Sequence, residues 1–259
     1  MGVLNVTPDS FSDGGDHAAR DAAIFAGVAM AADGADIVDV GGESTRPGAA
    51  EVPPDIERQR VLPVIRALAA RGLCISVDTR NASTMAAALD AGATIVNDVS
   101  GLTHDPHAAN LIAQRGCPVV LMHMRGTPAT MRDRARYADV AAEVIAELEG
   151  CLRAAERAGI RRDAIVLDPG IGFAKDADQS VAVLRALPRF ADLGRPLLVG
   201  VSRKSFIGAA SQEADARRRL PGSLAAGLFA LAHGAAILRV HDVRETVQAI
   251  RVWTVLAGG

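Results

Sequence analysis

Ten polar side chains share one feature in this 259-residue sequence: each stands at or just after the end of a short apolar stretch. They are Asn5, Asp39, Asp78, Asn97, His123, Asp168, Ser202, Lys204, Arg239 and His241. A buried, ionised carboxylate is costly unless a hydrogen-bond donor or a cation faces it. The amino and ring N–H groups of a heterocycle would meet that need for Asp78 and Asp168. Asn97 would satisfy a mixed donor–acceptor edge of the same ligand.

Other members of the set suit a phosphate group. Arg239 and His241 flank Val240, and residues two apart in a strand point to the same side. A guanidinium and an imidazole placed in this way form a clamp for a diphosphate. Asn5 offers a neutral oxygen, which suits Mg²⁺ because this ion keeps several waters and takes few protein ligands beside substrate phosphates.

The segment Ser202–Ser205 leads from an apolar stretch into a predicted helix. Backbone N–H groups at a helix start bind anions readily, and Lys204 adds a point cation. We find no Ser–His–Asp or Cys–His arrangement that indicates a covalent nucleophile, and no HxxxH motif or cysteine cluster that indicates zinc. The expected chemistry is therefore polarisation of a ligand and stabilisation of a leaving group.

Each of these residues also has a structural interpretation. A single Asp at a strand end often caps a helix or fastens a loop, and this interpretation stays open for Asp39. His123 is equally well explained as a core histidine with satisfied hydrogen bonds. Asp98 points away from its neighbour Asn97 in a strand, so we expect it to be structural. The number of polar residues at strand ends, rather than any one of them, favours a shared site.

A closed barrel of parallel strands would bring these side chains together. The apolar stretches are Gly2–Val6, Ala35–Val40, Leu73–Val77, Thr94–Val96, Pro118–Met122, Ala164–Leu167, Pro196–Val199 and Ala236–Val240. Amphipathic helical patterns alternate with them over residues 17–33, 55–70, 81–91, 106–115, 137–158, 178–191, 219–233 and 243–256. In such a barrel the carboxyl ends of the strands share one face, where active sites lie.

Glycines mark where the predicted helices end. They are Gly34, Gly72, Gly92, Gly116, Gly159, Gly194 and Gly234. Repeated helix stops before new strands indicate strand–helix units. An open, doubly wound sheet is the main alternative, but eight strands and the lack of GxGxxG after the first one favour a barrel. We therefore expect an α/β protein with one (β/α)8 TIM-barrel domain over residues 1–259. Its loops 7–15 and 41–48 are candidate lids.

The bulk composition excludes several classes of protein. Hydrophobic residues make up 49% and aromatic residues 3%, which predicts an aliphatic core. The net charge of −2 gives no footprint for nucleic acid or an anionic membrane, and we expect the cluster Arg217–Arg219 to be solvated. Cys74, Cys117 and Cys151 form no CxxC pair, and we expect the first two to be buried. With no signal-peptide or membrane-spanning pattern, we expect a cytoplasmic protein.

Eight stretches of the sequence resemble the dihydropteroate synthase family, in the order of that family. They are MGVLNVTPDSFSDGG (1–15), DVGGESTRPGA (39–49), SVDT (76–79), VNDVSG (96–101), LMHMRGTPATM (121–131), LDPGIGFAK (167–175), GVSRKSF (200–206) and RVHDV (239–243). They span the whole chain and together are far more specific than one short motif. The resemblance implies a barrel that joins para-aminobenzoate to 6-hydroxymethyl-7,8-dihydropterin diphosphate, giving 7,8-dihydropteroate and pyrophosphate in folate biosynthesis.

The resemblance also implies roles for individual residues. The pterin would bind against Asp78, Asn97, Met122, Asp168 and Lys204, and the diphosphate against Asn5, Arg239 and His241, with Mg²⁺ on Asn5. Para-aminobenzoate, with which sulfonamides compete in the family, would bind at Thr45, Arg46, Pro47, Phe173 and Ser205. The catalytic residues would be Asp78, Asp168, Lys204 and Arg239. The implied assembly is a homodimer through the outer helices.

We expect a largely dissociative displacement, because the positive charge left on the pterin CH₂ group is delocalised into the ring. Two other functions stay open. A pterin-binding methyltransferase barrel would share the pterin site but would not need the SRKSF, RVHDV or ESTRPGA stretches. A non-catalytic paralogue would bind pterin without turnover. The sequence departs from the family at Ala174, where many members have glycine, and we expect the extra methyl group to be tolerated.

Overall fold

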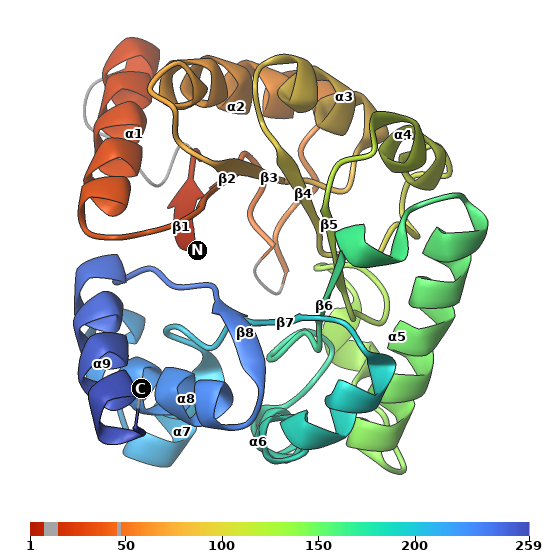
Figure 1. The fold of residues 1–259 in the computed structure, drawn as a ribbon, viewed down its shortest axis with the longest axis vertical. Helices are drawn as coiled ribbons and strands as arrows, with labels where there is room; N and C mark the ends of the chain where they lie inside the picture. Colours follow the sequence, from red (N-terminus) through yellow and green to blue (C-terminus); the bar gives the residue numbers. More distant parts are fainter. Residues whose placement is uncertain (8–14, 46–47, 259) are drawn as a thin grey trace.

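The computed structural model describes residues 1–7, 15–45 and 48–258, and its centre is one sheet of eight strands (Figure 1). They are β1 (Gly2–Asn5), β2 (Val38–Gly41), β3 (Ile75–Asp78), β4 (Ile95–Asp98), β5 (Val119–Met122), β6 (Ile165–Asp168), β7 (Leu197–Val199) and β8 (Ala235–Leu238). Each strand pairs in parallel with the next along the chain. The eight predicted apolar stretches are therefore confirmed as strands, to within a few residues at each end.

Backbone hydrogen bonds close the sheet between its first and last strands. The Val3 N–H donates to the Val240 carbonyl at 2.9 Å, and the Val240 N–H donates to the Met1 carbonyl at 3.0 Å. Gly2 and Val240 form a parallel bridge at the same place. An open, doubly wound sheet would leave both edge strands unpaired. The predicted (β/α)8 barrel is therefore confirmed.

Nine α-helices among the described residues surround the barrel (Figure 1). They are α1 (Gly15–Ala32), α2 (Pro54–Ala69), α3 (Ala82–Asp90), α4 (Ala108–Arg115), α5 (Val140–Arg157), α6 (Ala177–Arg185), α7 (Ser205–Ser211), α8 (Leu220–Ala232) and α9 (Val243–Leu256). The predicted helix over 178–191 is wrong in one respect. The structure divides it into α6 and a 3₁₀ helix, Leu187–Leu193, because Pro188 lacks an N–H and its ring clashes with the preceding turn of an α-helix.

The predicted helix stops have the backbone conformation that favours glycine. All seven have positive φ angles, between 60° at Gly194 and 107° at Gly92. Gly116 is the clearest case, because its N–H donates to the Ile112 carbonyl and ends α4 in a left-handed turn. These turns let each helix run directly into the next strand.

Aliphatic side chains fill the space between the barrel and the helices. Val40, Ile75 and Val77 of the strands pack with Ile65 and Leu68 of α2, and all five are inaccessible to solvent. Burial of each such side chain stabilises the fold by about 1.5–3 kcal/mol. The predicted aliphatic core is confirmed, and its strands hold the polar strand ends in fixed register.

The expectation for the cysteines is wrong. Cys74 is exposed and Cys117 is half-buried. Both stand just before a strand, β3 and β5 respectively, at the amino-terminal rim of the barrel. Solvent reaches this rim, so an apolar stretch in the sequence begins before the buried part of its strand.

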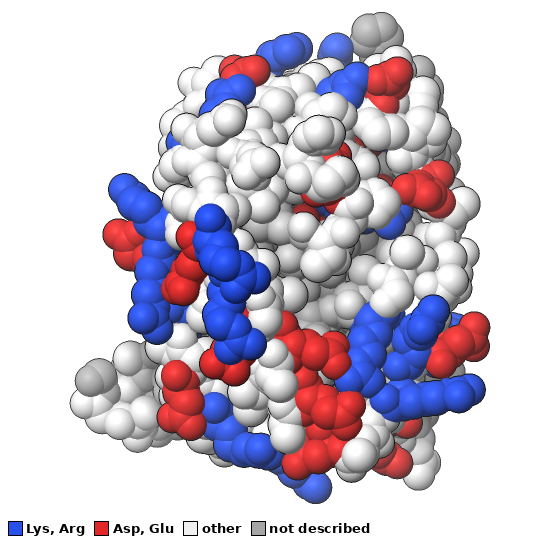
Figure 2. Space-filling view, turned by 90° about the vertical axis from the view of Figure 1, so that its right-hand side faces the viewer, with Lys and Arg blue, Asp and Glu red and all other residues white. Residues whose placement is uncertain are grey.

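The surface carries both signs of charge. Figure 2 shows acidic and basic side chains interspersed over one face. Arg217 and Arg218 are exposed and pair with Asp215 and Glu213, at 3.1 and 3.2 Å, as expected of a solvated cluster. The expectation is wrong for Arg219, which is half-buried and donates to the carbonyl oxygens of Glu213 and Ala214 at 2.9 and 2.7 Å. None of the helices that the structure describes is long and apolar enough to cross a membrane.

Candidate active site

A cavity opens among the carboxyl ends of the strands. The lining residues are Val3, Asn97, Val99, Met122, Asp168, Ile171, Phe173, Gly200, Ser202, Lys204, Arg239 and His241. They come from many separate strands and loops, because a parallel barrel presents all its carboxyl ends on one side.

Seven predicted site residues line this cavity: Asn97, Met122, Asp168, Phe173, Lys204, Arg239 and His241. Asp78 joins them through an ion pair with Arg239. Asn5, Thr45 and Ser205 are not among the lining residues. Asn5 ends β1, Thr45 lies half-buried in the loop after β2, and Ser205 is exposed at the start of α7. Arg46 and Pro47 lie outside the described residues.

Arg239 is the centre of a charge cluster inside the barrel. Its Nε donates to Asp39 Oδ2 and its Nη2 donates to Asp78 Oδ2, both at 2.7 Å. The Asn97 Nδ2 group donates to the same Asp39 oxygen at 2.9 Å. Asp39 is fully buried. The interpretation of Asp39 as a cap is therefore wrong, and this residue supports two predicted site residues at once.

Two carboxylates share this one guanidinium, and the proton affinity of Asp78 is changed by its surroundings. Burial raises the pKa of Asp78 to about 7, against the opposing effect of Arg239, and the nearby Asp39 raises it further. Burial alone would lower the pKa of Arg239, but Asp39 and Asp78 raise it above its usual value. Arg239 therefore stays charged, whereas Asp78 changes its charge near neutral pH.

Asp168 and Lys204 form the opposite side of the site. The Gly170 N–H donates to Asp168 Oδ1 at 2.7 Å, which orients the carboxylate. Burial raises the pKa of Asp168. Burial lowers the pKa of Lys204 to about 8, while the facing charge of Asp168 raises it. The Lys204 Nζ atom lies 4.2 Å from the centre of the Phe173 ring, in cation–π contact.

His241 lies at the same mouth, oriented by a hydroxyl group. Its Nδ1 atom is 3.0 Å from Ser202 Oγ, and its backbone N–H donates to that oxygen at 3.2 Å. Burial lowers the pKa of His241 to about 4, and Arg203 lowers it further. His241 is therefore neutral at pH 7, and its ring provides a neutral N–H rather than a positive charge.

His123 does not line the cavity. Its Nε2 atom is 2.9 Å from Glu147 Oε2 on α5, and its Nδ1 atom is 2.9 Å from the Nζ atom of Lys175. Burial lowers the pKa of His123 to about 4, and Lys175 lowers it further. Of the two interpretations left open, the core histidine with satisfied hydrogen bonds is confirmed. Sequence reasoning gave no role to its partner Lys175, although the stretch GFAK contains it.

A buried ion pair ties the loop after β2 to the barrel. Arg80 donates from Nε to Glu43 Oε2 and from Nη2 to Glu43 Oε1, both at 3.1 Å. The Val52 N–H also donates to Glu43 Oε1, at 2.9 Å. This bidentate pair fixes both ends of the loop that contains Thr45. Sequence reasoning missed Glu43 and Arg80, because nothing local in the sequence pairs them.

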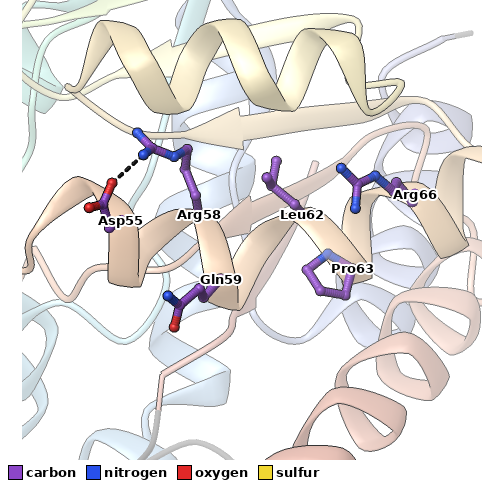
Figure 3. A pocket seen from close by; sticks show the side chains of 6 residues that line it. All are labelled: Asp55, Arg58, Gln59, Leu62, Pro63 and Arg66. Atoms are coloured by element: carbon purple, nitrogen blue, oxygen red, sulfur yellow. Dashed lines mark hydrogen bonds and ion pairs between the residues drawn. The ribbon is translucent and has the colours of Figure 1, made fainter.

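A wider, shallow hollow lies on the outer surface along α2 (Figure 3). Its lining residues are Asp55, Arg58, Gln59, Leu62, Pro63 and Arg66. Arg58 pairs with Asp55 there and donates to Ser83 Oγ of α3 at 2.8 Å. These contacts fasten two helices, and no predicted site residue lies nearby. The barrel mouth is therefore the candidate active site.

Asn5, at the end of β1, offers a neutral side-chain oxygen that Mg²⁺ can take as a ligand. No group of three His, Cys, Asp or Glu side chains that could hold a metal occurs among residues 1–7, 15–45 and 48–258. Mg²⁺ commonly takes one or two protein ligands beside water and substrate phosphates, so Asn5 at a strand end fits such a role.

Known proteins are similar to this chain in sequence and in structure. The profile of the family described as pterin binding enzyme matches residues 1–241. A dihydropteroate synthase of Escherichia coli K12 is 47% identical, over 97% of this chain and 89% of that protein. A solved structure of Xanthomonas albilineans dihydropteroate synthase with 4-aminobenzoic acid has a TM-score of 0.95 and 47% identity, over 100% of this chain and 93% of that one. A Yersinia pestis dihydropteroate synthase structure with a sulfonamide drug has a TM-score of 0.93 and 41% identity, over 100% and 94%. The chain belongs to the pterin-binding enzyme family and, within it, to the dihydropteroate synthases.

Proposed function

We propose that the barrel mouth joins para-aminobenzoate to 6-hydroxymethyl-7,8-dihydropterin diphosphate, giving 7,8-dihydropteroate and pyrophosphate. The observation that carries the proposal is the convergence of Asn97, Asp168, Lys204 and Arg239 on one cavity. The relatives named dihydropteroate synthase support the reaction. A solved structure with 4-aminobenzoic acid supports the arylamine substrate, and one with 7,8-dihydropteroate supports the product.

The pterin ring would bind between the charge cluster and Asp168. Asp168 uses Oδ1 to accept the Gly170 N–H and makes no hydrogen bond to a described residue with Oδ2. This second oxygen suits the amino and ring N–H donors of a pterin. Asn97 faces the same cavity, and Met122 supplies a buried apolar wall. The ring would therefore lie deep in the mouth, with its CH₂ group toward solvent.

The bond that breaks joins the pterin CH₂ carbon to the diphosphate oxygen, and its electron pair leaves with the diphosphate. Arg239 uses Nε and Nη2 for Asp39 and Asp78, and its Nη1 makes no hydrogen bond to a described residue. We assign that nitrogen, with the neutral imidazole of His241, to the leaving diphosphate. Fixed donors at the place where negative charge develops lower the barrier.

The cationic CH₂–pterin group would then be attacked by the neutral amine of para-aminobenzoate. A nitrogen–carbon bond forms, and the nitrogen loses a proton to solvent. The carboxylates of Asp78 and Asp168 stabilise the positive charge while it exists. Phe173, held against Lys204, offers an aromatic wall to the arylamine ring, and the carboxylate would bind at Ser205, at the start of α7.

Mg²⁺ fits this arrangement with Asn5 as its protein ligand and with the diphosphate and water as the others. When bound, it would neutralise charge on the leaving diphosphate. The residues of the chain would bind and orient the substrate: Arg239 and His241 would hold the leaving diphosphate, and the barrel would orient the pterin.

Pyrophosphate release tests the reaction. The purified chain should release pyrophosphate only when the pterin diphosphate, para-aminobenzoate and Mg²⁺ are all present, and mass spectrometry should detect dihydropteroate. No release with any divalent metal would contradict the synthase proposal. Tight pterin binding without release would favour the non-catalytic paralogue.

Asp168→Ala tests the pterin role. We expect it to weaken pterin binding by about 1.5–3 kcal/mol, because a charge-assisted hydrogen bond is lost. Calorimetry with the pterin substrate alone measures this change. Asp21→Ala, on the exposed face of α1, is the matched control and should bind pterin as the native chain does. Unchanged affinity in Asp168→Ala would remove this residue from the pterin site.

We further infer a cytoplasmic homodimer formed through the outer helices. Val252, Val255 and Leu256 of α9 are 56%, 80% and 81% exposed, and apolar side chains gathered on a surface are commonly covered in an assembly. The three cysteines are free, which agrees with a reducing compartment. Sedimentation equilibrium would measure the mass, and a monomer at micromolar concentration would contradict the dimer.

A further inference from the structure

Lys175 is a buried cation outside the residues that line the active-site cavity. It is 7% exposed and ends the loop between β6 and α6. Its Nζ atom donates to the carbonyl oxygens of Gly170 and Phe173, both at 3.0 Å, and lies 2.9 Å from His123 Nδ1. All three contacts hold the one loop that carries Phe173 into the mouth.

The number of hydrogen bonds at Lys175 Nζ matches that of a protonated side chain. An ammonium has three N–H donors, and three acceptors surround it. His123 must then accept at Nδ1 and carry its own proton on Nε2, from which it donates to Glu147 Oε2 at 2.9 Å. Every donor in the chain Lys175–His123–Glu147 has a partner when the lysine is charged and the histidine is neutral, and this state is favoured because the pKa of His123 is lowered to about 4 and that of Lys175 to about 7. A planar guanidinium has a different fork of donors and would not match these converging acceptors.

The composition of the chain sharpens this point. The sequence has 28 lysines and arginines, and just two of them, Lys175 and Lys204, are lysines. Both act on Phe173: Lys204 lies over its ring at 4.2 Å, and Lys175 binds its carbonyl oxygen. All the remaining Lys/Arg positions hold arginine. The compact ammonium group at these two positions therefore indicates that a guanidinium would not fit the contacts there.

The loop requires such a tie because its backbone is tightly wound. Ala174 has a φ angle of 47°, in the left-handed region that disfavours alanine. Gly170 lies so close to β5 that a Cβ atom there would collide with the His123 carbonyl oxygen. Strained backbone persists only where surrounding contacts fix it. Lys175 supplies three of those contacts from a single atom.

We propose that Lys175 is a positioning residue for the arylamine subsite: its ammonium binds Gly170, Phe173 and His123 and so fixes Phe173 against Lys204. This inference rests on the proposed function, because it assigns Phe173 to para-aminobenzoate. Lys175 acts through Phe173 and does not touch the reacting atoms. The charged and titratable groups around it are Asp168, Glu147, Lys204, Arg125 and His123. Burial lowers the pKa of Lys175 to about 7, and Asp168 and Glu147 raise it.

Steady-state kinetics of Lys175→Met test the proposal. Methionine has similar length and no donors, so we expect the KM for para-aminobenzoate to rise at least tenfold. The affinity for the pterin substrate alone should change less than twofold, because Asp168 and Asn97 stay in place. Lys175→Arg should not restore the KM, although it restores the charge. Ile65→Val, a buried change on α2 far from the loop, is the control for a general loss of stability and should leave the KM unchanged.

A second measurement is made on the native chain labelled with [ε-¹³C]lysine. Its two lysines give two side-chain resonances, and the Lys175 variants serve only to assign them. We expect the Lys175 resonance to titrate at least two pH units below the usual value of 10.5 and to shift when para-aminobenzoate binds beside pyrophosphate and pterin.

The outcomes separate this inference from the proposed function. A native chain without pyrophosphate release overturns the synthase proposal. A native chain that turns over, with an unchanged KM for para-aminobenzoate in Lys175→Met, overturns only the role of Lys175. A Lys175 resonance that does not shift when para-aminobenzoate binds would show that this group is not coupled to the arylamine subsite, and it would also overturn that role.

Discussion

Asp39 shows how a single side chain can support a site without facing the ligand. It is fully buried in β2 and binds both Arg239 and Asn97, which lie 200 and 58 positions away in the sequence. Removal of one partner of a buried ion pair is costly, because the remaining charge stays buried. Asp39 therefore keeps Arg239 in place together with Asp78, its other partner.

Ala174→Gly is a prediction at the scale of one residue. Alanine at a φ of 47° costs about 1–2 kcal/mol, and glycine does not pay this cost. Glycine also has more conformational entropy in the unfolded chain, which stabilises the unfolded state by roughly 0.4–1 kcal/mol and offsets part of the benefit. We expect the free energy of unfolding in urea to rise by about 0.5 kcal/mol.

The reciprocal substitution Gly116→Ala is its control. Gly116 has a φ of 63°, and no heavy atom lies within 4 Å of the place where a Cβ would stand. Alanine at this position is therefore unfavourable only because of the backbone conformation. We expect the free energy of unfolding to fall by roughly 0.5–1 kcal/mol. A loss of stability in both variants would contradict the backbone explanation for Ala174.

At the scale of the element, local capping decides where helices begin. The Asp139 side chain accepts the Ala142 N–H at 3.0 Å and starts α5 three residues later than the apolar periodicity predicts. Asp176 forms a capping box with Gln179 and starts α6 immediately after Lys175. Caps of this kind fix the ends of the loops that reach the barrel mouth.

Asp139→Ala is the prediction at this scale. It should lower the free energy of unfolding by about 1 kcal/mol, because one N–H at the start of α5 loses its acceptor. Asp139→Ser should recover most of the loss. Asp163→Ala, which removes an exposed carboxylate paired with Arg161, is the control and should change stability by less than about 0.5 kcal/mol. Equal effects of the two alanine variants would reject the capping role.

At the scale of the whole molecule, the buried charges of the barrel make stability depend on pH. The pKa of Asp78 is raised from 3.8 to about 7, so the folded chain binds a proton there that the unfolded chain releases from about pH 4 upward. The stability contributed by this group is fully present below pH 4 and is lost as the pH rises through about 7.

Asp78→Asn removes this titration. We expect the native chain to lose stability relative to Asp78→Asn as the pH rises from 4.5 to 7.5, measured by urea unfolding at several pH values. Asp21→Asn, at an exposed position on α1, should follow the native chain throughout. A difference between the native chain and Asp78→Asn that does not change with pH would contradict the raised pKa.

The sequence by itself determined the elements and the chemistry of the site. Apolar runs of parallel-strand length, helical periodicity and helix-stop glycines predict a barrel, because each is a local consequence of backbone geometry and burial. The polar strand ends predict the mouth, since parallel strands share one carboxyl face. Local pattern also predicts that Asp98 is structural, and its carboxylate does bind the Ser100 and Leu102 N–H groups.

Only the tertiary structure decided which polar groups meet. The pairs Arg239–Asp39, Arg80–Glu43 and Lys175–His123 join residues 37 to 200 positions apart. No local pattern encodes such a pair, because it depends on strand register, barrel closure and the depth of each side chain. For this reason the sequence predicted seven residues of the cavity, whereas the contacts by which Asp39 and Lys175 hold Arg239 and Phe173 were recognised only in the folded chain.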